Sequence, residues 1–226
     1  SIDNNKSCAS CHLPSKAFAT NFPTNQGANG AEGTRNSPSL ANIGYHPYFT
    51  REGGVPTLEM QVLVPIQEEN EFNHHILDIS DSLRLDSSYV TAAHEAYGSD
   101  VNAFVITRAI SCFERTLVSG MSVFDRYVEG DVGALTESEL SGFALFNSKG
   151  CNNCHSGELF TNFEIINNGL HKEYADPGLF NLTNDEADIG KFKVASLRNV
   201  GITQPYMYDG SLSTLDDVLD HYVSGG

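Results

Sequence analysis

Two copies of one short motif constrain this chain more than any other feature of its sequence. Residues 8–12 read CASCH and residues 151–155 read CNNCH, so each motif holds two cysteines separated by two residues and followed at once by a histidine. Two thiols at this spacing suit thioether bonds to the vinyl groups of one porphyrin, and the adjacent histidine then supplies a nitrogen to the iron. We therefore expect two covalently bound haem c groups. The residues that would hold them are Cys8, Cys11, His12, Cys151, Cys154 and His155.

Other sites built from paired cysteines fit the two motifs less well. A zinc ribbon does not need a histidine after each second cysteine, and its two halves usually lie closer together in sequence. A redox-active dithiol would lie where a strand meets a helix, and no β-rich segment precedes either motif. Haem attachment of this kind takes place outside the cytoplasm, so we predict a periplasmic protein. The fifth cysteine, Cys112, lies in an apolar pattern with helical spacing and is expected to be a buried, inert thiol.

The composition narrows the range of partners. A formal charge of −16 over 226 residues excludes nucleic acid, because a backbone-binding surface needs positive patches. The acidity favours two interpretations equally: solubility alone, or a face that steers a basic electron-donor protein toward a docking site. No run of about 18 apolar residues predicts a membrane span. The first residues do not read as a signal peptide, and both ends read as cut, which favours processing, proteolysis or an incomplete chain.

The chain is predicted to be mostly α, with two cytochrome c-like haem domains, long loops and little β structure. A boundary at Gly130–Gly133 would separate an N-terminal domain, 1–132, from a C-terminal domain, 133–226. Each half contains a haem motif, then a long loop (13–56 and 156–212), then a helix, which indicates a weak internal duplication. A first helix is expected to begin at Thr57 and to be interrupted by Pro65. Two more are expected over 87–97 and 101–118, and a fourth after a capping box at Thr136–Glu139. The last is expected to begin at Ser213, with Asp216 in its first turn.

Further blocks, spread along nearly the whole chain, resemble one family. The chain is similar to the bacterial di-haem cytochrome c peroxidases and their relatives of the MauG type. The blocks that carry this resemblance, besides the two motifs, are Arg35–Leu40, Thr57–Gln61, Phe113–Leu117, Phe124–Tyr127, Gly190–Val194, Leu197–Val200 and Pro205–Gly210. The family usually has more residues at both ends.

The resemblance implies different tasks for the two haems. Peroxide would react at the first haem, on His12, and electrons would enter through the second, on His155. The distal glutamate of the family falls on Glu71, which would move a proton between the two peroxide oxygens. From the residues alone Glu71 could not be distinguished from its acidic neighbours, and a solvated acidic turn would be the simpler interpretation. Gln61 and Pro65 would line the same pocket, with Gln61 donating a hydrogen bond to peroxide.

The resemblance also implies a sixth ligand for the second haem, which is Met in typical peroxidases and Tyr in MauG. This position falls on Tyr222. A phenolate stabilises oxidised iron, whereas a thioether favours the ferrous state. Tyr222 would alternatively be a core residue on the apolar face of its helix, and Met207 is the nearby sulfur candidate.

Two departures from the family concern the first haem. The loop before Arg35–Leu40 lacks the family's displaceable histidine, so the first haem is expected to be five-coordinate. His46, His74 and His75 are expected at the surface. The family also has a tryptophan before the Thr57 helix, credited with electron transfer between the haems. The aligned segment, 48–54, has none, so electrons would cross without an aromatic relay, a tyrosine would substitute, or fast transfer would be lost.

A calcium ion between the domains is a further expectation from the family. Its ligands would be the Asn36 side chain and the backbone carbonyls of Thr203 and Pro205, with water completing the shell. A turn-forming role is the other interpretation of Asn36.

The favoured function is an oxidoreductase that reduces hydrogen peroxide with electrons from a small cytochrome c or cupredoxin. One alternative is a MauG-like enzyme that oxidises a protein or organic substrate through a high-valent iron state. A second alternative is a di-haem electron carrier without catalytic activity. A homodimer is possible in each case.

Overall fold

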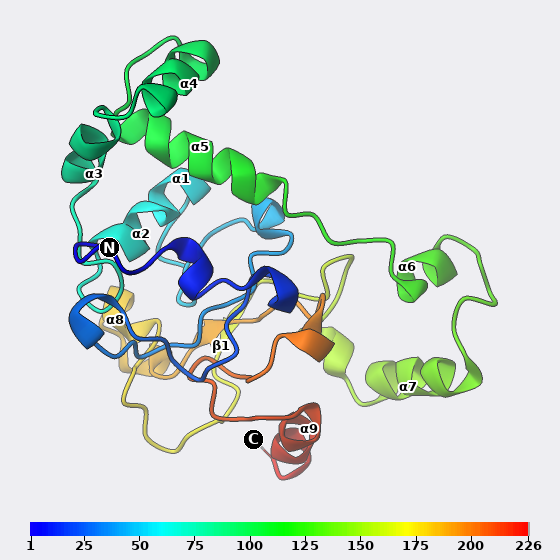
Figure 1. Cartoon of the computed structure of the whole chain (residues 1–226). Coiled ribbons are helices and arrows are strands. Elements are labelled where there is room, and N and C mark those ends of the chain that lie inside the picture. The colour runs from blue at the N-terminus through cyan, green and yellow to red at the C-terminus, as the bar shows by residue number, and fades with distance from the viewer. Residues whose placement is uncertain (226) are drawn as a thin grey trace.

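Helices separated by long irregular loops make up residues 1–225, the part of the chain that the computed structural model describes (Figure 1). The only sheet among these residues is one antiparallel pair of two-residue strands, in which Ile165 lies opposite Lys193. The chain is therefore mostly α with little β structure, as expected. No helix in this part of the chain has both the length and the apolar character to cross a membrane. The elements are α1 (Leu58–Gln61), α2 (Leu63–Gln67), α3 (Ile76–Leu83), α4 (Ser87–Tyr97), α5 (Ala103–Arg115), α6 (Val123–Val128), α7 (Glu137–Ser148), β1 (Ile165–Ile166), α8 (Phe180–Thr183), β2 (Phe192–Lys193) and α9 (Leu215–Val223).

Helices α2 to α5 share one apolar cluster, and Figure 1 shows α3, α4 and α5 grouped at one end of the molecule. The bounds of α4 are those predicted, and it ends at Gly98, whose φ of 62° a residue without Cβ adopts readily. Helix α5 lies within the predicted 101–118, because the Asn102 side chain accepts a hydrogen bond from the Val105 amide and caps it. The buried members of the cluster are Val62, Ile66, Ile76, Ala93, Val101, Val105 and Ile106.

Pro65 does not end its helix as expected, but lies inside α2. The interruption comes earlier, at Val62, between α1 and α2. Proline has no amide hydrogen, so the Gln61 carbonyl loses the donor that it would find four residues later. The helix therefore breaks one turn before the proline rather than at it.

Cys112 is exposed, and the expectation of a buried thiol is wrong. The buried side chains of α5 include Thr107 and Ser111, and Ser111 has no exposed surface. A helix turns by about 100° per residue, so the side chain after Ser111 is rotated away from the buried face. The apolar pattern misled because polar residues continue the buried face.

The capping box of α7 is confirmed, since Thr136 and Glu139 exchange hydrogen bonds as predicted. The corresponding box of α9 lies one residue later than expected. Thr214 is the N-cap and Asp217 closes the box, in place of Ser213 and Asp216.

The internal duplication is more regular than the sequence pattern suggested. Residues 39–44 read SLANIG and residues 196–201 read SLRNVG, 157 residues further along the chain. Asn42 and Asn199 occupy equivalent places in the two segments, with φ of 62° and 60°, and each precedes a short 3-10 helix. Four identical residues of six and the same backbone conformation identify these segments as repeats.

The same separation continues as far as α1 and α9. Phe49 forms an isolated bridge with Val55, and their equivalents Tyr206 and Leu212 do the same. Equivalent threonines then cap the two helices. The positive φ angles also repeat, in the pairs Thr50 and Met207, and Gly53 and Gly210.

In this register, Pro65 in α2 is the equivalent of Tyr222 in α9. The two positions lie about two turns beyond equivalent helix starts, yet one carries a ring without a donor atom and the other a phenol. The repeat therefore places a potential metal ligand in the second half where the first half has none.

Candidate active site

The first motif folds into a tight turn that fixes its histidine. Cys8 begins a 3-10 helix, Cys8–Ser10, and the His12 amide donates to the Cys8 carbonyl at 2.9 Å. The His12 ring lies with Nδ1 2.7 Å from the Phe18 carbonyl oxygen. A carbonyl only accepts, so Nδ1 carries the proton and Nε2 keeps its lone pair. Burial lowers the pKa of His12, which favours the neutral, ligating form.

The second motif repeats this arrangement. The His155 amide donates to the Cys151 carbonyl at 2.9 Å. Its Nδ1 lies 3.1 Å from both the Phe160 and the Ala195 carbonyl oxygens, and burial lowers its pKa. Both histidines therefore have the carbonyl partner on Nδ1 that orients a metal-ligating imidazole, and both leave Nε2 to bind iron.

The surroundings of the motifs fit bound haem. The four motif cysteines are free thiols, as thioether formation requires. The accessible surface of the described residues is 12902 Å², against about 10,000 Å² for a compact monomer of this mass. Half-buried rings of α6, α7 and the second motif pack edge to face, with Phe124 5.1 Å from Phe143 and 5.0 Å from Phe160. A chain with so open a core and such aromatic walls suits large apolar cofactors that complete it.

Glu71 lies near enough to the first motif for its charge to act on a motif cysteine. Its charge raises the pKa of the Cys11 thiol, after burial of the thiol itself. Partial desolvation, and then the Glu68 carboxylate, raise the pKa of Glu71 although solvent still reaches its side chain. A carboxyl group with a raised pKa exchanges protons near neutral pH more readily than an ordinary one.

Gln61 and Pro65 come from the broken helix beside this carboxylate. The Gln61 Oε1 atom is buried without a hydrogen-bond partner among the described residues. The Pro65 carbonyl accepts from the Phe72 amide at 3.1 Å and so ties the Glu71 segment to α2. An unpartnered amide oxygen is unfavourable unless something else satisfies it, which fits a polar group bound nearby.

Gly27 holds the loop of Glu71 in place, and its replacement should disturb that loop. A Cβ at residue 27 would come within 2.1 Å of the Asn70 carbonyl oxygen and 2.6 Å of that of Glu71. We expect Gly27→Ala to destabilise the protein by about 1–3 kcal/mol, as overpacking of this kind does. The measurement is urea unfolding. Gly142→Ala is the control, since a Cβ there meets nothing within 4 Å in α7 and should stabilise slightly. Equal effects of both substitutions would contradict this account.

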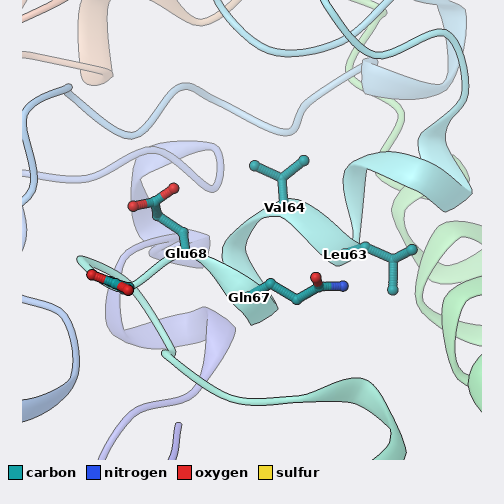
Figure 2. Close-up of a pocket in the computed structure, with 5 residues that line it drawn as sticks. Leu63, Val64, Gln67 and Glu68 are labelled. Carbon is teal, nitrogen blue, oxygen red and sulfur yellow. The ribbon is translucent and has the colours of Figure 1, made fainter.

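A hollow lies beside α2. Leu63, Val64 and residues 67–69 line it, and its volume is about 470 Å³. Figure 2 shows Val64 and Glu68 pointing to one side of α2, and Leu63 and Gln67 pointing to another. The lining contains none of the motif residues, so this hollow is not the place where a motif histidine would meet its iron.

Tyr222 and Met207, the two candidates for the second haem's sixth ligand, meet at one amide group. The Asn168 Nδ2 atom lies 3.4 Å from the Met207 sulfur and 3.5 Å from the Tyr222 hydroxyl oxygen. Tyr222 keeps 48% of its surface exposed, so it is not a core residue of α9. Because the phenol of Tyr222 is exposed, its oxygen is accessible to a metal ion.

Comparison with known proteins decides the family. The family model described as di-haem cytochrome c peroxidase matches residues 1–133. The chain belongs to the di-haem cytochrome c peroxidase family. It is 35% identical over 224 residues to the methylamine utilization protein MauG of Methylorubrum extorquens, covering 97% of this chain and 64% of that protein. It is 31% identical over 255 residues to the cytochrome-c peroxidase IdrP2 of Denitromonas iodatirespirans, covering 99% and 70%.

Solved structures of this family have the same fold. A MauG-like protein associated with microbial copper homeostasis superposes with a TM-score of 0.88 at 31% identity, covering 96% of this chain and 70% of that one. The di-haem peroxidase BthA of Burkholderia thailandensis superposes with a TM-score of 0.82 at 23% identity, covering 98% and 67%. The chain thus spans about two thirds of the length of its relatives.

Glu114 is a candidate functional residue that the sequence did not single out. It lies on α5, and its charge raises the pKa of the Cys8 thiol, after the burial of that thiol. Its Oε2 atom is buried without a partner among the described residues, and burial raises its pKa to about 7. Carboxyl groups whose pKa burial raises toward neutrality are concentrated at functional sites. The signal in the sequence was its place in the block Phe113–Leu117, one of those that carry the family resemblance.

The raised pKa of Glu114 predicts a pH-dependent stability. The unfolded chain releases this proton near pH 4.5 and the folded protein near pH 7, so the folded state binds more protons in between. Stability therefore falls as the pH rises through this window, by on the order of 2 kcal/mol. Glu114→Gln should remove this part of the fall, as urea unfolding at the two ends of the window would measure. Parallel pH profiles of the two proteins would contradict it.

His46 is half-buried, and the expectation that it lies at the surface is wrong. Its ring packs edge to face on Phe163 at 5.0 Å, and Nδ1 lies 3.4 Å from the Lys193 ammonium. Burial, and then the Lys193 charge, lower its pKa to about 4. Among the other two histidines, His75 is exposed as expected and His74 is half-buried. His46 was misjudged because its partners come from the other half of the chain.

Asn36, the side-chain member of the expected calcium ligands, already has a cation against it. Asn36 is buried, and its amide nitrogen donates to the Phe22 carbonyl. Its side-chain oxygen accepts from an Arg51 guanidinium nitrogen at 3.2 Å, and its backbone oxygen accepts from the same nitrogen at 2.6 Å. Pro205 is buried and Thr203 half-buried on the other side of the interface. This donor set does not fit calcium, because the one side-chain oxygen faces a fixed positive charge.

Proposed function

We propose that this protein reduces hydrogen peroxide to water with electrons from a small periplasmic redox protein. The observation that carries the proposal is the asymmetry of two otherwise equal motifs. Both histidines have Nδ1 on a backbone carbonyl, but only the first motif has Glu71 with a raised pKa beside it. Membership of the peroxidase family supports the same conclusion.

Each half of the chain would hold one covalently attached haem c. Residues 1–132 would form the peroxidatic domain on His12, and residues 133–226 the electron-transfer domain on His155. The repeat of backbone conformation between the halves supports this division. When bound, the haems supply the redox chemistry, taking up electrons one at a time and activating peroxide.

The residues of the first half would handle protons. Glu71 takes a proton from one peroxide oxygen and returns it to the other, which leaves as water. Gln61 lies on the same side and would orient peroxide by hydrogen bonding, while Pro65 adds no ligand atom. The overall reaction consumes two electrons and two further protons and yields two molecules of water.

The second half would receive electrons, with Tyr222 as the sixth ligand of its iron. The formal charge of −16 suits a basic donor such as a small cytochrome c, and a cupredoxin is the other donor class. Attachment of haem c outside the cytoplasm supports a periplasmic location. The homodimer stays a prediction.

A MauG-like oxidation of a protein or organic substrate is the second candidate. A tyrosine at the sixth-ligand position favours it, since a phenolate stabilises oxidised iron. The similarity to MauG of Methylorubrum extorquens supports it as well.

Steady-state turnover tests the proposal. Purified holoprotein is mixed with a reduced small cytochrome c, and oxidation of the cytochrome is followed after addition of peroxide. Peroxide-dependent oxidation at more than about 1 per second, within the usual range of enzymes, supports the peroxidase. Slow oxidation of the cytochrome, together with oxidation of an added protein or organic donor, would support the second candidate instead. No peroxide consumption in either assay would leave only an electron carrier.

A further inference from the structure

The interface between the two halves has a pseudo-twofold arrangement. The Asn36 amide donates to the Tyr208 carbonyl at 2.8 Å, and the Lys193 amide donates to the Arg51 carbonyl at 2.6 Å. In the register of the repeat, Asn36 is equivalent to Lys193 and Arg51 to Tyr208. Each hydrogen bond is therefore the image of the other, as in an isologous interface between two copies of one chain.

At one end of this interface the Lys193 ammonium contacts a backbone carbonyl and a histidine ring nitrogen. Lys193 Nζ donates to the Tyr48 carbonyl at 2.9 Å and lies 3.4 Å from His46 Nδ1. The repeat equivalents of His46 and Tyr48 are Thr203 and Pro205. These are the residues expected to hold calcium with Asn36, whose own equivalent is Lys193. The Lys193 ammonium therefore lies at the place that the pseudo-twofold relation makes equivalent to the expected calcium position.

At the other end of the interface the residue equivalent to Lys193 is Asn36, which is uncharged. The cation there is Arg51, whose guanidinium donates twice to the Asn36 backbone oxygen, at 2.6 and 3.1 Å, and once to its side-chain oxygen. The equivalent of Arg51 at the lysine end is the uncharged Tyr208. Each end therefore has one positive side chain, supplied from opposite halves of the chain.

The cations of the interface lie among carboxylates. Arg35 pairs with Glu52 and with Asp176, at 3.0 Å between Nη2 and Oδ1 in the second case. Burial lowers the pKa of Arg51 to about 10 and that of Lys193 to about 8, so both remain protonated at neutral pH. The charges of Arg35, Arg51 and Lys193 act together with those of carboxylates that include Glu52, Asp176 and Asp209.

We propose that Arg51 and Lys193 are the built-in cations of this interface, and that the protein takes up no calcium between its halves. A calcium ion on the Asn36 side-chain oxygen would lie against the guanidinium that shares this oxygen, and two cations so close repel strongly in a part-buried site. The inference does not depend on the peroxidase activity, because calcium content and thermal stability are measured without turnover.

Calcium content and melting temperature of the holoprotein test the proposal. We expect far less than one calcium per chain after incubation with millimolar calcium and desalting, and the same melting temperature with calcium or with chelator. Arg51→Gln frees the Asn36 oxygens and should acquire calcium, which should raise its melting temperature by about 5–10 °C. Arg51→Lys keeps the charge and should show no such rise.

The results that overturn the proposal are equally specific. One tightly bound calcium in the wild-type protein, or a melting temperature lowered by chelator, would refute it even if the Arg51 variants do not fold. A folded Arg51→Gln protein that is indifferent to calcium would show that Arg51 does not occupy a calcium position.

A matched pair of variants tests the lysine end. Lys193→Asn places a side-chain amide beside the Tyr48 carbonyl. This amide is equivalent to that of Asn36 at the other end of the interface. We expect a calcium-dependent rise of its melting temperature. Lys193→Met removes the charge without adding an oxygen, and should be destabilised with no rescue by calcium. Equal responses of the two variants would refute the assignment of Lys193.

Discussion

Replacement of Glu71 by glutamine is expected to lower kcat for peroxide reduction by about 10²- to 10⁴-fold, the usual contribution of a general acid–base group. Glutamine keeps the size and a hydrogen-bonding oxygen but can neither accept nor return a proton. The Glu71 backbone is held by the Ala28 amide, which donates to its carbonyl at 2.6 Å, so the substitution should leave the loop in place. The measurement is steady-state oxidation of reduced cytochrome c at saturating peroxide.

The pH dependence gives this experiment a second readout. Because the pKa of Glu71 is raised, the base form grows at a higher pH than for an ordinary glutamate, and kcat/KM should rise with pH through that range. The kcat/KM of the Glu71→Gln protein should not show this rise with pH. Glu69→Gln is the control, because Glu69 is an exposed neighbour two residues away and should keep both rate and profile. A Glu71→Gln protein within about twofold of wild type would remove Glu71 as the proton carrier.

Local features of this chain could be predicted from its sequence, because their physical cause is local. The two haem motifs, the capping box at Thr136 and the bounds of α4 depend on residues a few positions apart. The Pro65 break was misplaced by one turn because its effect falls on a carbonyl four residues earlier. Cys112 was misjudged because the buried face of α5 is continued by polar side chains, which a hydrophobic pattern cannot detect.

Features that depend on contacts between the halves could not be predicted. His46 and Arg51 acquire their environments from residues far along the chain or across a loop, and neither has a neighbour in sequence that indicates it. The raised pKa of Glu114 arises from burial beside the first motif, which only the packing of α5 creates. The repeat was visible as a shared plan, but its register became clear only when equal φ angles appeared at Asn42 and Asn199.

The equivalence of Pro65 and Tyr222 predicts that the two haems can be made alike. Tyr222→Phe removes the hydroxyl from the second half and should leave its iron without the phenolate. Axial ligands set haem potentials over a range of about 0.8 V, so a rise on the order of 0.1 V or more is expected for that haem. Spectroelectrochemistry measures it, and an unchanged ferric spectrum and potential would contradict Tyr222 as a ligand.

Pro65→Tyr is the converse change, and it places a phenol in the first half where the repeat has one in the second. Tyrosine restores the amide hydrogen that proline lacks, so α1 and α2 are free to join into one helix, as α9 is continuous through Tyr222. If the new phenol occupies the iron about 99% of the time, peroxide turnover falls about a hundredfold. The high-spin part of the ferric spectrum should disappear with it.

Pro65→Val separates ligation from a change of shape. Valine also restores the amide hydrogen but offers no ligand atom, so the high-spin spectrum and most of the peroxide turnover should remain. Loss of turnover in both variants, with the high-spin spectrum intact, would mean that Pro65 matters for packing around α2. Low-spin conversion in Pro65→Tyr alone would place residue 65 over the first iron, as residue 222 is proposed to lie over the second. In that case the difference between a reactive and an electron-accepting half depends on one side chain at equivalent positions of a repeat.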